Sequence, residues 1–448
     1  MDLPDAFKKQ MEAQLGKDQD AFFQALQSPS PVSIRFNPKK FQPKGNNKVP
    51  WCLAGRYLED RPSFTLDPLF QAGAYYVQEA SSMLLEQAVT QSIDITAPTV
   101  ALDLCAAPGG KSTHLLGLMS SESLVISNEA IRGRAAGLIE NIEKWGYPNS
   151  IITQNDPADF SRLEGFADLI LVDAPCSGEG LFRKDPLAIR EWSPLNVERC
   201  AARQRRILAD VWNTLRPGGA LIYSTCTYNT KENHENLRWV AENNDCTFLP
   251  LRLDPIWGID EVISDNYSGY QCFPHHLRGE GFFISVMKKA GQAACQVPRS
   301  KDRLLYPSNS TSAELNTWIT NPENTFHFLH GSVVRMLPRR YKPHLLVLLE
   351  SARVIQAGTA MGELKKNKIV PDHAIALSIF RNRKQLAGIA LSKDQALNYL
   401  RMDRLQLPEW PVGYHVVEYE GLGLGWVNLL PGRINNLFPS SRRIRLGN

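Results

Sequence analysis

Short apolar runs rich in β-branched residues alternate with amphipathic stretches through the middle of the chain. The stretches between most of them have helical periodicity, notably at residues 133–145 and 197–215, and Arg216-Pro217-Gly218-Gly219 predicts the end of the second helix. The six apolar runs predict strands at residues 100–105, 124–128, 150–154, 168–172, 220–225 and 282–287. This alternation over about 200 residues predicts an α/β fold with a doubly wound parallel sheet.

The regions on either side follow other patterns. Residues 1–97 begin with apolar positions at helical spacing, continue with a strand pattern at 32–36, and predict a small α+β domain. Beyond a connector near 290–300, strand patterns at 416–419 and 425–429 predict a small β-rich module. The sequence therefore predicts three parts, at residues 1–97, 98–292 and 300–448.

Composition narrows the class of protein. The first residues lack the apolar core of a secretory signal, and no run of about 20 apolar residues could span a bilayer. We expect a cytoplasmic protein, most simply a monomer, without membrane contact. Its eight cysteines lack Cys-x-x-Cys spacing, and His275 and His276 lack other residues at ligand spacing, so we expect free thiols and no metal.

Charge is uneven along the chain. The whole sequence has a net charge of +4, but residues 301–448 contain 20 basic and 11 acidic residues, and the segment from Arg433 onward contains no acid. Such a region favours a polyanionic partner, with an ordinary hydrated basic surface as the alternative.

Two cysteines fifty residues apart, Cys176 and Cys226, each follow a predicted strand. In an open parallel sheet the carboxyl ends of the strands are where ligands and chemistry are found. The pair therefore predicts two thiols at one reaction centre.

The segment Asp103–Ser112 ends the first predicted strand and opens a helix, with small residues that let backbone N–H groups approach a ligand. It is not a Walker phosphate loop, because Cys105 stands where the first glycine should be. Acids follow the next three strands: Glu129, Asp156 and Asp173. Each acid alone is more often a helix cap or a hydrated loop residue, but three in phase predict a cofactor that carries adenosine.

Residues 103–112, 173–178 and 224–227 together resemble the Nop/Sun family of S-adenosylmethionine-dependent RNA cytosine-C5 methyltransferases. Segments 78–82, 141–146 and 274–283 agree with this family in order, and the resemblance covers about residues 30–290. The basic tail resembles the PUA-like RNA-binding module of the bacterial ribosomal-RNA members. The resemblance implies a Rossmann-like methyltransferase core at 98–292, with RNA-binding regions before and after it.

The resemblance also implies roles for particular residues. Glu129 is implied on the ribose, Asp156 near the adenine and Asp173 beside the methionine end, although Pro157 directly after Asp156 departs from the expected loop. Further cofactor contacts are implied for Cys105, Ala106, Ala107, Pro108, Gly109, Gly110 and Lys111.

Carbon 5 of cytosine is a weak nucleophile until a thiolate adds to carbon 6. In the RNA family the cysteine of the Thr-Cys motif attacks, which points to Cys226, with Cys176 assisting breakdown of the adduct. The DNA cytosine methyltransferases instead use a Pro-Cys cysteine, which would be Cys176. Asp173, if protonated, and Lys111 are candidate donors to the activated ring.

The target base must be unpaired or extruded, because stacking shields carbon 6. Candidate RNA contacts are Arg35, Arg183, Lys184 and the basic tail. We expect methylation of small-subunit (16S) ribosomal RNA. A tRNA cytosine-C5 methyltransferase and a non-catalytic RNA-binding ribosome assembly factor are the alternatives.

Overall fold

The structure is a computed structural model that describes residues 2–42, 45–264, 266–366 and 368–445. Its centre is a ten-stranded sheet in the order β10-β11-β12-β8-β7-β4-β5-β6-β15, with β9 paired to β12. Five neighbouring strands, from β8 to β6, run parallel, whereas the pairs at both ends are antiparallel. The parallel strands are β4 (Val100–Asp103), β5 (Leu124–Asn128), β6 (Ser150–Thr153), β7 (Ala167–Asp173) and β8 (Leu215–Thr225).

The remaining strands of this sheet are β9 (Cys246–Phe248), β10 (Ile259–Ser264), β11 (Tyr267–Cys272), β12 (Phe282–Lys289) and β15 (Val354–Ala357). The six predicted strands correspond to β4–β8 and β12. The helix end predicted at residues 216–219 is wrong by a few residues. The helix already ends at Trp212, and residues 216–219 belong to β8. The α/β prediction is confirmed.

Helices cover both faces of the sheet because successive residues of each strand point to opposite sides. Ala101, Val125 and Ile152 pack with helices α4 (Leu85–Ser92), α5 (Gly110–Leu118) and α6 (Arg132–Trp145). Leu102, Ile126 and Ile151 pack with α8 (Pro194–Trp212), α9 (His234–Asn243) and α11 (Lys342–Ser351). Each of the buried valine, leucine and isoleucine side chains stabilises the fold by about 1.5–3 kcal/mol relative to an exposed one.

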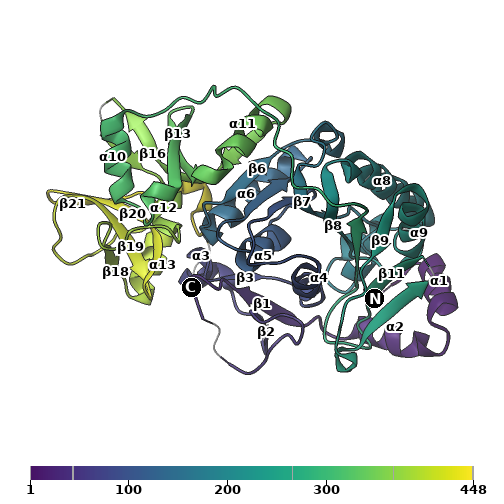
Figure 1. The fold of residues 1–448 in the computed structure, drawn as a ribbon. Coiled ribbons are helices and arrows are strands. Elements are labelled where there is room, and N and C mark those ends of the chain that lie inside the picture. Colours follow the sequence, from purple (N-terminus) through teal and green to yellow (C-terminus); the bar gives the residue numbers. More distant parts are fainter. Residues whose placement is uncertain (1, 43–44, 265, 367, 446–448) are drawn as a thin grey trace.

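The N-terminal region lies against the core in two pieces. Helices α1 (Asp5–Leu15) and α2 (Gln19–Gln27) lie beside β11 and α9 at one end of the central sheet (Figure 1). Their buried Phe7 and Phe22 pack with Phe182, Trp192 and Tyr228 of the core. A separate three-stranded sheet consists of β1 (Val32–Phe36), β2 (Gly55–Leu58) and β3 (Tyr75–Val77), and α3 (Pro68–Gln71) lies in the connection between β2 and β3.

The C-terminal region (green to yellow) lies beyond β6, at the other end of the sheet (Figure 1). It contains two four-stranded sheets, β13-β14-β16-β17 and β18-β19-β20-β21, and it also supplies β15, the edge strand of the central sheet. The strands are β13 (Thr325–His330), β14 (Val333–Pro338), β16 (Thr359–Lys365), β17 (Lys368–Pro371), β18 (Gly388–Ala390), β19 (Gly413–Tyr419), β20 (Leu422–Leu430) and β21 (Arg433–Asn436). The remaining helices are α7 (Pro186–Glu191) in the core, and α10 (Asn309–Thr317), α12 (His373–Leu377) and α13 (Lys393–Leu400) in this region. No helix within the described ranges has the length and apolar character needed to cross a membrane.

Candidate active site

Adjacent parallel strands bring the two cysteines together. Asp173 at the end of β7 pairs with Ser224 near the end of β8, so the loops that follow these strands start side by side. The Sγ atoms of Cys176 and Cys226 lie 3.0 Å apart, and both side chains are half-buried. The hydrogen bond with Cys226, together with burial, raises the pKa of the Cys176 thiol well above its ordinary range. Cys176 therefore holds its proton at neutral pH.

A charged pair lies on the same strand ends. The Nζ atom of Lys111 is 2.7 Å from Oδ2 of Asp173, and the hydroxyl of Ser224 donates to Oδ1 of Asp173 at 2.8 Å. Burial lowers the pKa of Lys111, but the neighbouring Asp173 carboxylate outweighs this effect and the net shift is upward. Both oxygens of Asp173 thus accept hydrogen bonds, and Lys111 and Asp173 stay the predicted donors to a ligand.

The predicted cofactor loop connects β4 to α5 and is fixed by α6. Its turn requires a glycine at position 109, where φ is +112°, and a Cβ there would lie 3.3 Å from the side chain of Leu138 on α6. From the same helix, Asn141 donates to the carbonyl of Pro108 at 2.8 Å, and Arg134 donates to the carbonyl of Ala107 at 2.7 Å. The loop is thus held in shape by side chains rather than by its own sequence alone.

Asp103, the last residue of β4, is fully buried beneath this loop. One of its oxygens accepts a hydrogen bond from Ser112 at 2.6 Å, while the other, Oδ1, has no partner among the described residues. Burial raises the pKa of Asp103 to about 7. Asp103 was not among the residues predicted to bind the cofactor, although its position at the end of the first parallel strand is the signal that could have indicated such a role.

Two of the predicted acids differ in their surroundings. Glu129 is buried and accepts hydrogen bonds from the backbone N–H groups of Ile131 at 2.9 Å and of Ala107, in the loop, at 3.3 Å. Asp156 instead caps the short helix that begins at Pro157 and forms a two-pronged ion pair with Arg206 of α8, at 2.9 and 3.1 Å. The structure therefore brings Glu129, Lys111 and Asp173 to the loop, whereas Asp156 is paired with Arg206 on α8.

Two of the predicted RNA contacts are wrong, because their side chains are buried and paired inside the protein. Arg35 is 1% exposed and donates to Thr113 Oγ1 at 2.7 Å and to the Gly110 carbonyl at 3.0 Å, so it supports the first turn of α5. The Arg183 side chain is 6% exposed and donates to Glu280 at 2.9 Å. Lys184 also faces Glu280, at 3.6 Å, with about a third of its side chain exposed.

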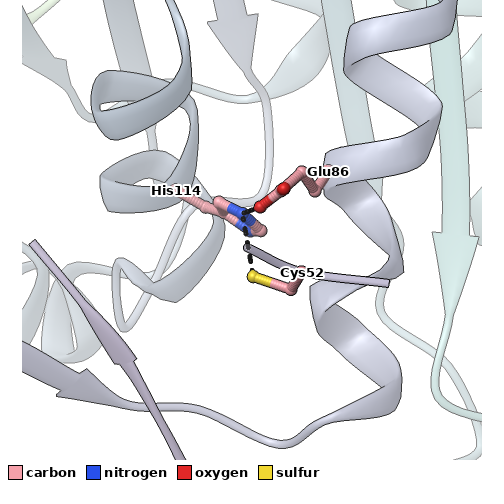
Figure 2. A group of neighbouring side chains, drawn as sticks. All are labelled: Cys52, Glu86 and His114. Atoms are coloured by element: carbon pink, nitrogen blue, oxygen red, sulfur yellow. Dashed lines mark hydrogen bonds and ion pairs between the residues drawn. The ribbon is translucent and has the colours of Figure 1, made fainter. Parts of the chain in front are cut away.

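One group of possible metal ligands occurs within the described part of the chain: Cys52, Glu86 and His114, all buried (Figure 2). Nε2 of His114 is 3.3 Å from Glu86 and 3.9 Å from the Cys52 thiol. A structural zinc site normally has four protein ligands, and a zinc-bound histidine usually donates its second N–H to an acceptor. Here three ligands gather, and Nδ1 of His114 has no partner in the described ranges. We interpret the group as a hydrogen-bonded cluster that joins residue 52 to α4 and α5. The absence of a metal from this protein stays a prediction.

Comparison with known families identifies three matching models along the chain. They are the N-terminal domain of 16S rRNA methyltransferase RsmF at residues 3–80, the 16S rRNA methyltransferase RsmB/F model at 92–288 and the RsmF PUA domain at 387–444. The ribosomal RNA small subunit methyltransferase F of Escherichia fergusonii is 36% identical over 320 residues, which are 67% of this chain and 66% of that protein. Its counterpart from Pectobacterium atrosepticum is 37% identical over 290 residues, or 60% and 59% of the two chains. The match thus spans slightly less than two thirds of these relatives' own length.

Solved structures agree on the fold. A methyltransferase homolog from Pyrococcus horikoshii is 26% identical with a TM-score of 0.54, and covers 63% of this chain and 94% of its own. NSun6 from the same organism, determined with SFG, has a TM-score of 0.54 at 20% identity and covers 64% of this chain and 99% of its own. The second likeness supports the fold alone.

Proposed function

The chain belongs to the RsmB/F family of 16S rRNA methyltransferases, and we propose that it methylates carbon 5 of a cytosine in small-subunit ribosomal RNA with S-adenosylmethionine as the methyl donor. The observation that carries this proposal is the pair of thiols 3.0 Å apart, beside the Lys111–Asp173 pair at the ends of β7 and β8. A protein that only bound RNA would have no use for two adjacent thiols beside an ammonium group. The non-catalytic alternative is therefore disfavoured.

The residues around the loop suit the cofactor. Oδ1 of buried Asp103, which has no partner in the part of the chain that the structure describes, can accept a hydrogen bond from an amino group. Glu129, which accepts a hydrogen bond from the backbone of Ala107, can also accept from ribose hydroxyls. When bound, the cofactor supplies a methyl group attached to a positively charged sulfur. Asp156 is the weakest member of the proposed cofactor set, because it is already paired with Arg206.

Cys226 is the proposed nucleophile. Its thiolate adds to carbon 6 of the cytosine, and the electron pair of the ring double bond moves so that carbon 5 can take the methyl group. Lys111 donates to nitrogen 3 or to the carbonyl oxygen at carbon 2, where negative charge collects. The proton on carbon 5 then passes to water, its electron pair re-forms the double bond between carbons 5 and 6, and the carbon–sulfur bond breaks to free the Cys226 thiolate. Cys176, which keeps its proton at neutral pH and lies 3.0 Å from Cys226, donates a hydrogen bond to that sulfur as it leaves.

The three regions divide the work in this proposal. Residues 98–292 form the catalytic core, and residues 1–97 and 300–448 bind RNA, the latter with its excess of basic residues and its match to a PUA domain. Ribosomal RNA as the substrate would place the reaction in the bacterial cytoplasm. A tRNA substrate would use the same core and is the second candidate.

Methyl transfer tests the proposal directly. The purified protein is incubated with methyl-labelled S-adenosylmethionine and, in separate reactions, unmodified 16S rRNA, small subunits and tRNA, and the product nucleoside is identified by mass spectrometry. We expect 5-methylcytosine in the ribosomal samples, none with Cys226→Ala, and a covalent protein–RNA adduct with Cys176→Ala. Methyl transfer to tRNA alone would show that tRNA, rather than ribosomal RNA, is the substrate. Full activity of Cys226→Ala would overturn the mechanism.

A further inference from the structure

The two thiols lie on different loops, so their separation depends on what holds one loop against the other. Cys176 follows β7 and Cys226 follows β8, and neither residue belongs to a strand or helix. A displacement of about 1 Å in a reacting group can lower the rate about 100-fold. A thiol on a loop without supporting contacts would move further than catalysis tolerates. The contacts that fix these loops are therefore part of the site.

A buried carboxylate from the loop that carries Cys226 fixes the loop that carries Cys176. Glu232, six residues after Cys226, is completely buried, and its Oε2 accepts a hydrogen bond from the backbone N–H of Ser177 at 3.0 Å. The same oxygen accepts from the side-chain amide of Gln204 at 2.8 Å, and that amide also donates to the carbonyl of Pro175 at 3.0 Å. The backbone is thus held on both sides of Cys176.

A second carboxylate makes the reverse connection. Glu179, three residues after Cys176, is also completely buried, and its Oε2 accepts from the backbone N–H of Tyr228 at 3.1 Å. Its Oε1 accepts from Asn229 at 3.2 Å, from the Trp192 indole at 3.0 Å and from Gln10 of α1 at 3.1 Å. The loop that carries Cys226 is therefore fixed by the chain that follows Cys176.

Shorter contacts complete the joint between the loops. The hydroxyls of Ser177 and Thr227, each one residue after a cysteine, lie 3.0 Å apart, and the N–H of Gly180 donates to the Cys226 carbonyl at 2.9 Å. A Cβ at residue 180 would lie 2.9 Å from that carbonyl oxygen. Only glycine permits the loops to approach this closely.

Burying a carboxylate is unfavourable unless its hydrogen bonds compensate, and burial raises the pKa of Glu232 to about 7. Two such residues beside the same pair of thiols indicate a role that apolar residues could not fill. An isosteric apolar side chain would pack equally well there but would leave the N–H groups of Ser177 and Tyr228 without their acceptors.

We propose that Glu232 and Glu179 are reciprocal positioning residues, with Glu232 holding Cys176 in place for release of the methylated base and Glu179 holding Cys226 in place for attack. This inference rests on the proposed function, because it assigns one carboxylate to each half of the reaction. It predicts that the two residues, although similar in burial and in kind of contact, have opposite effects on the covalent intermediate.

The test compares Glu232→Leu and Glu179→Leu, which keep most of the side-chain volume and remove the acceptor, with Glu232→Gln and Glu179→Gln, which keep an acceptor oxygen. Glu198→Leu is the matched control, since Glu198 is exposed and pairs on the surface with Lys231. Each full-length variant is mixed with the ribosomal RNA substrate and methyl-labelled S-adenosylmethionine. Methyl transfer is followed through a single turnover, and the covalent adduct is measured on denaturing gels.

We expect Glu232→Leu to accumulate adduct by about tenfold or more while first-turnover methyl transfer stays within about threefold of the parent. Glu179→Leu should lower both adduct formation and first-turnover transfer by about tenfold or more. Glu232→Gln should retain most of the parent behaviour, whereas Glu179→Gln should retain less, because hydrogen-bond donors face both oxygens of Glu179. Glu198→Leu should match the parent.

Equal losses of adduct and transfer in both leucine variants, or no adduct in a folded Glu232→Leu, would overturn the inference. Should a leucine variant fail to fold, Glu232→Asp and Glu179→Asp, which withdraw the oxygen by one methylene, must show the same opposite effects. Cys226→Ala and Cys176→Ala are run in parallel. If these two behave as the proposed function requires and the glutamate variants do not, the positioning role alone is refuted.

Discussion

Replacing Arg183 by Met distinguishes a structural role for this side chain from the RNA contact predicted from the sequence. Its guanidinium donates to Glu280 at 2.9 Å, to the carbonyl of Ala25 at the end of α2 at 3.1 Å and to the carbonyl of Gly279 at 2.6 Å. The side chains of Arg183 and Glu280 are 6% and 2% exposed. The pair thus ties α2 to the segment before β12.

Removing one partner of a buried ion pair costs about 3–5 kcal/mol, because the remaining charge loses its compensation. Glu280 would keep the hydroxyl of Ser30 at 2.5 Å and Lys184 at 3.6 Å, and Met would keep most of the packing of the arginine stem. We therefore expect a loss at the lower end of this range, about 3 kcal/mol in the free energy of unfolding.

Urea unfolding followed by tryptophan fluorescence measures the loss, with Lys231→Met as the control. Nζ of Lys231 lies 3.0 Å from Glu198, and the two side chains are 47% and 58% exposed, so the control should lose less than about 1 kcal/mol. RNA affinity is measured on the same proteins at a temperature where all are folded. A loss below about 1 kcal/mol for Arg183→Met, together with weaker RNA binding, would refute the structural assignment.

Three further outcomes are expected. Dialysis against a chelator should leave the unfolding temperature unchanged, whereas a fall with stoichiometric loss of metal would make the cluster around Cys52 a metal site. Burial lowers the pKa of His114 and of His327 to about 4, so the folded protein binds fewer protons than the unfolded chain below about pH 6.5. Each histidine should therefore lower the free energy of unfolding by about 2 kcal/mol by pH 5. Urea midpoints that do not change with pH would contradict this. In calorimetric titrations with S-adenosylmethionine, Glu129→Ala should weaken binding about tenfold and Asp156→Ala by less than threefold; equal effects would reinstate Asp156.

The parallel part of the fold was predictable because its strands are buried on both faces and appear as continuous apolar runs. The antiparallel edges were not. Strand β10 is mostly half-buried or exposed, and β15 reaches the sheet from about 200 residues beyond its neighbour β6, so neither has a local signal that distinguishes it from a loop. Edge strands of this kind are determined by tertiary pairing.

The residues of the site also differ in how far the sequence predicted them. Cys176 and Cys226 could be placed together from the sequence because topology brings the ends of neighbouring parallel strands to one edge. Arg35 could not be placed, since its partners at Gly110 and Thr113 are more than 70 residues away and a charged residue in a strand otherwise suggests a surface. Glu179 and Glu232 were missed for the same reason, because their burial depends on segments that meet only in the folded chain.

These long-range contacts change what the N-terminal region contributes. Arg35 of β1 supports the first turn of α5, next to the proposed cofactor loop, and Gln10 of α1 bonds to both Glu179 and Asn229, beside the loop of Cys226. Gln14 of the same helix donates to the carbonyl of Tyr228 at 3.0 Å. A region that only captured RNA would not need to contact the buried side of the proposed cofactor loop and of the loop that carries Cys226. Substitutions in residues 1–97 should therefore alter the rate of the chemical step as well as the affinity for RNA, because side chains of this region contact the residues that fix the loop of Cys226.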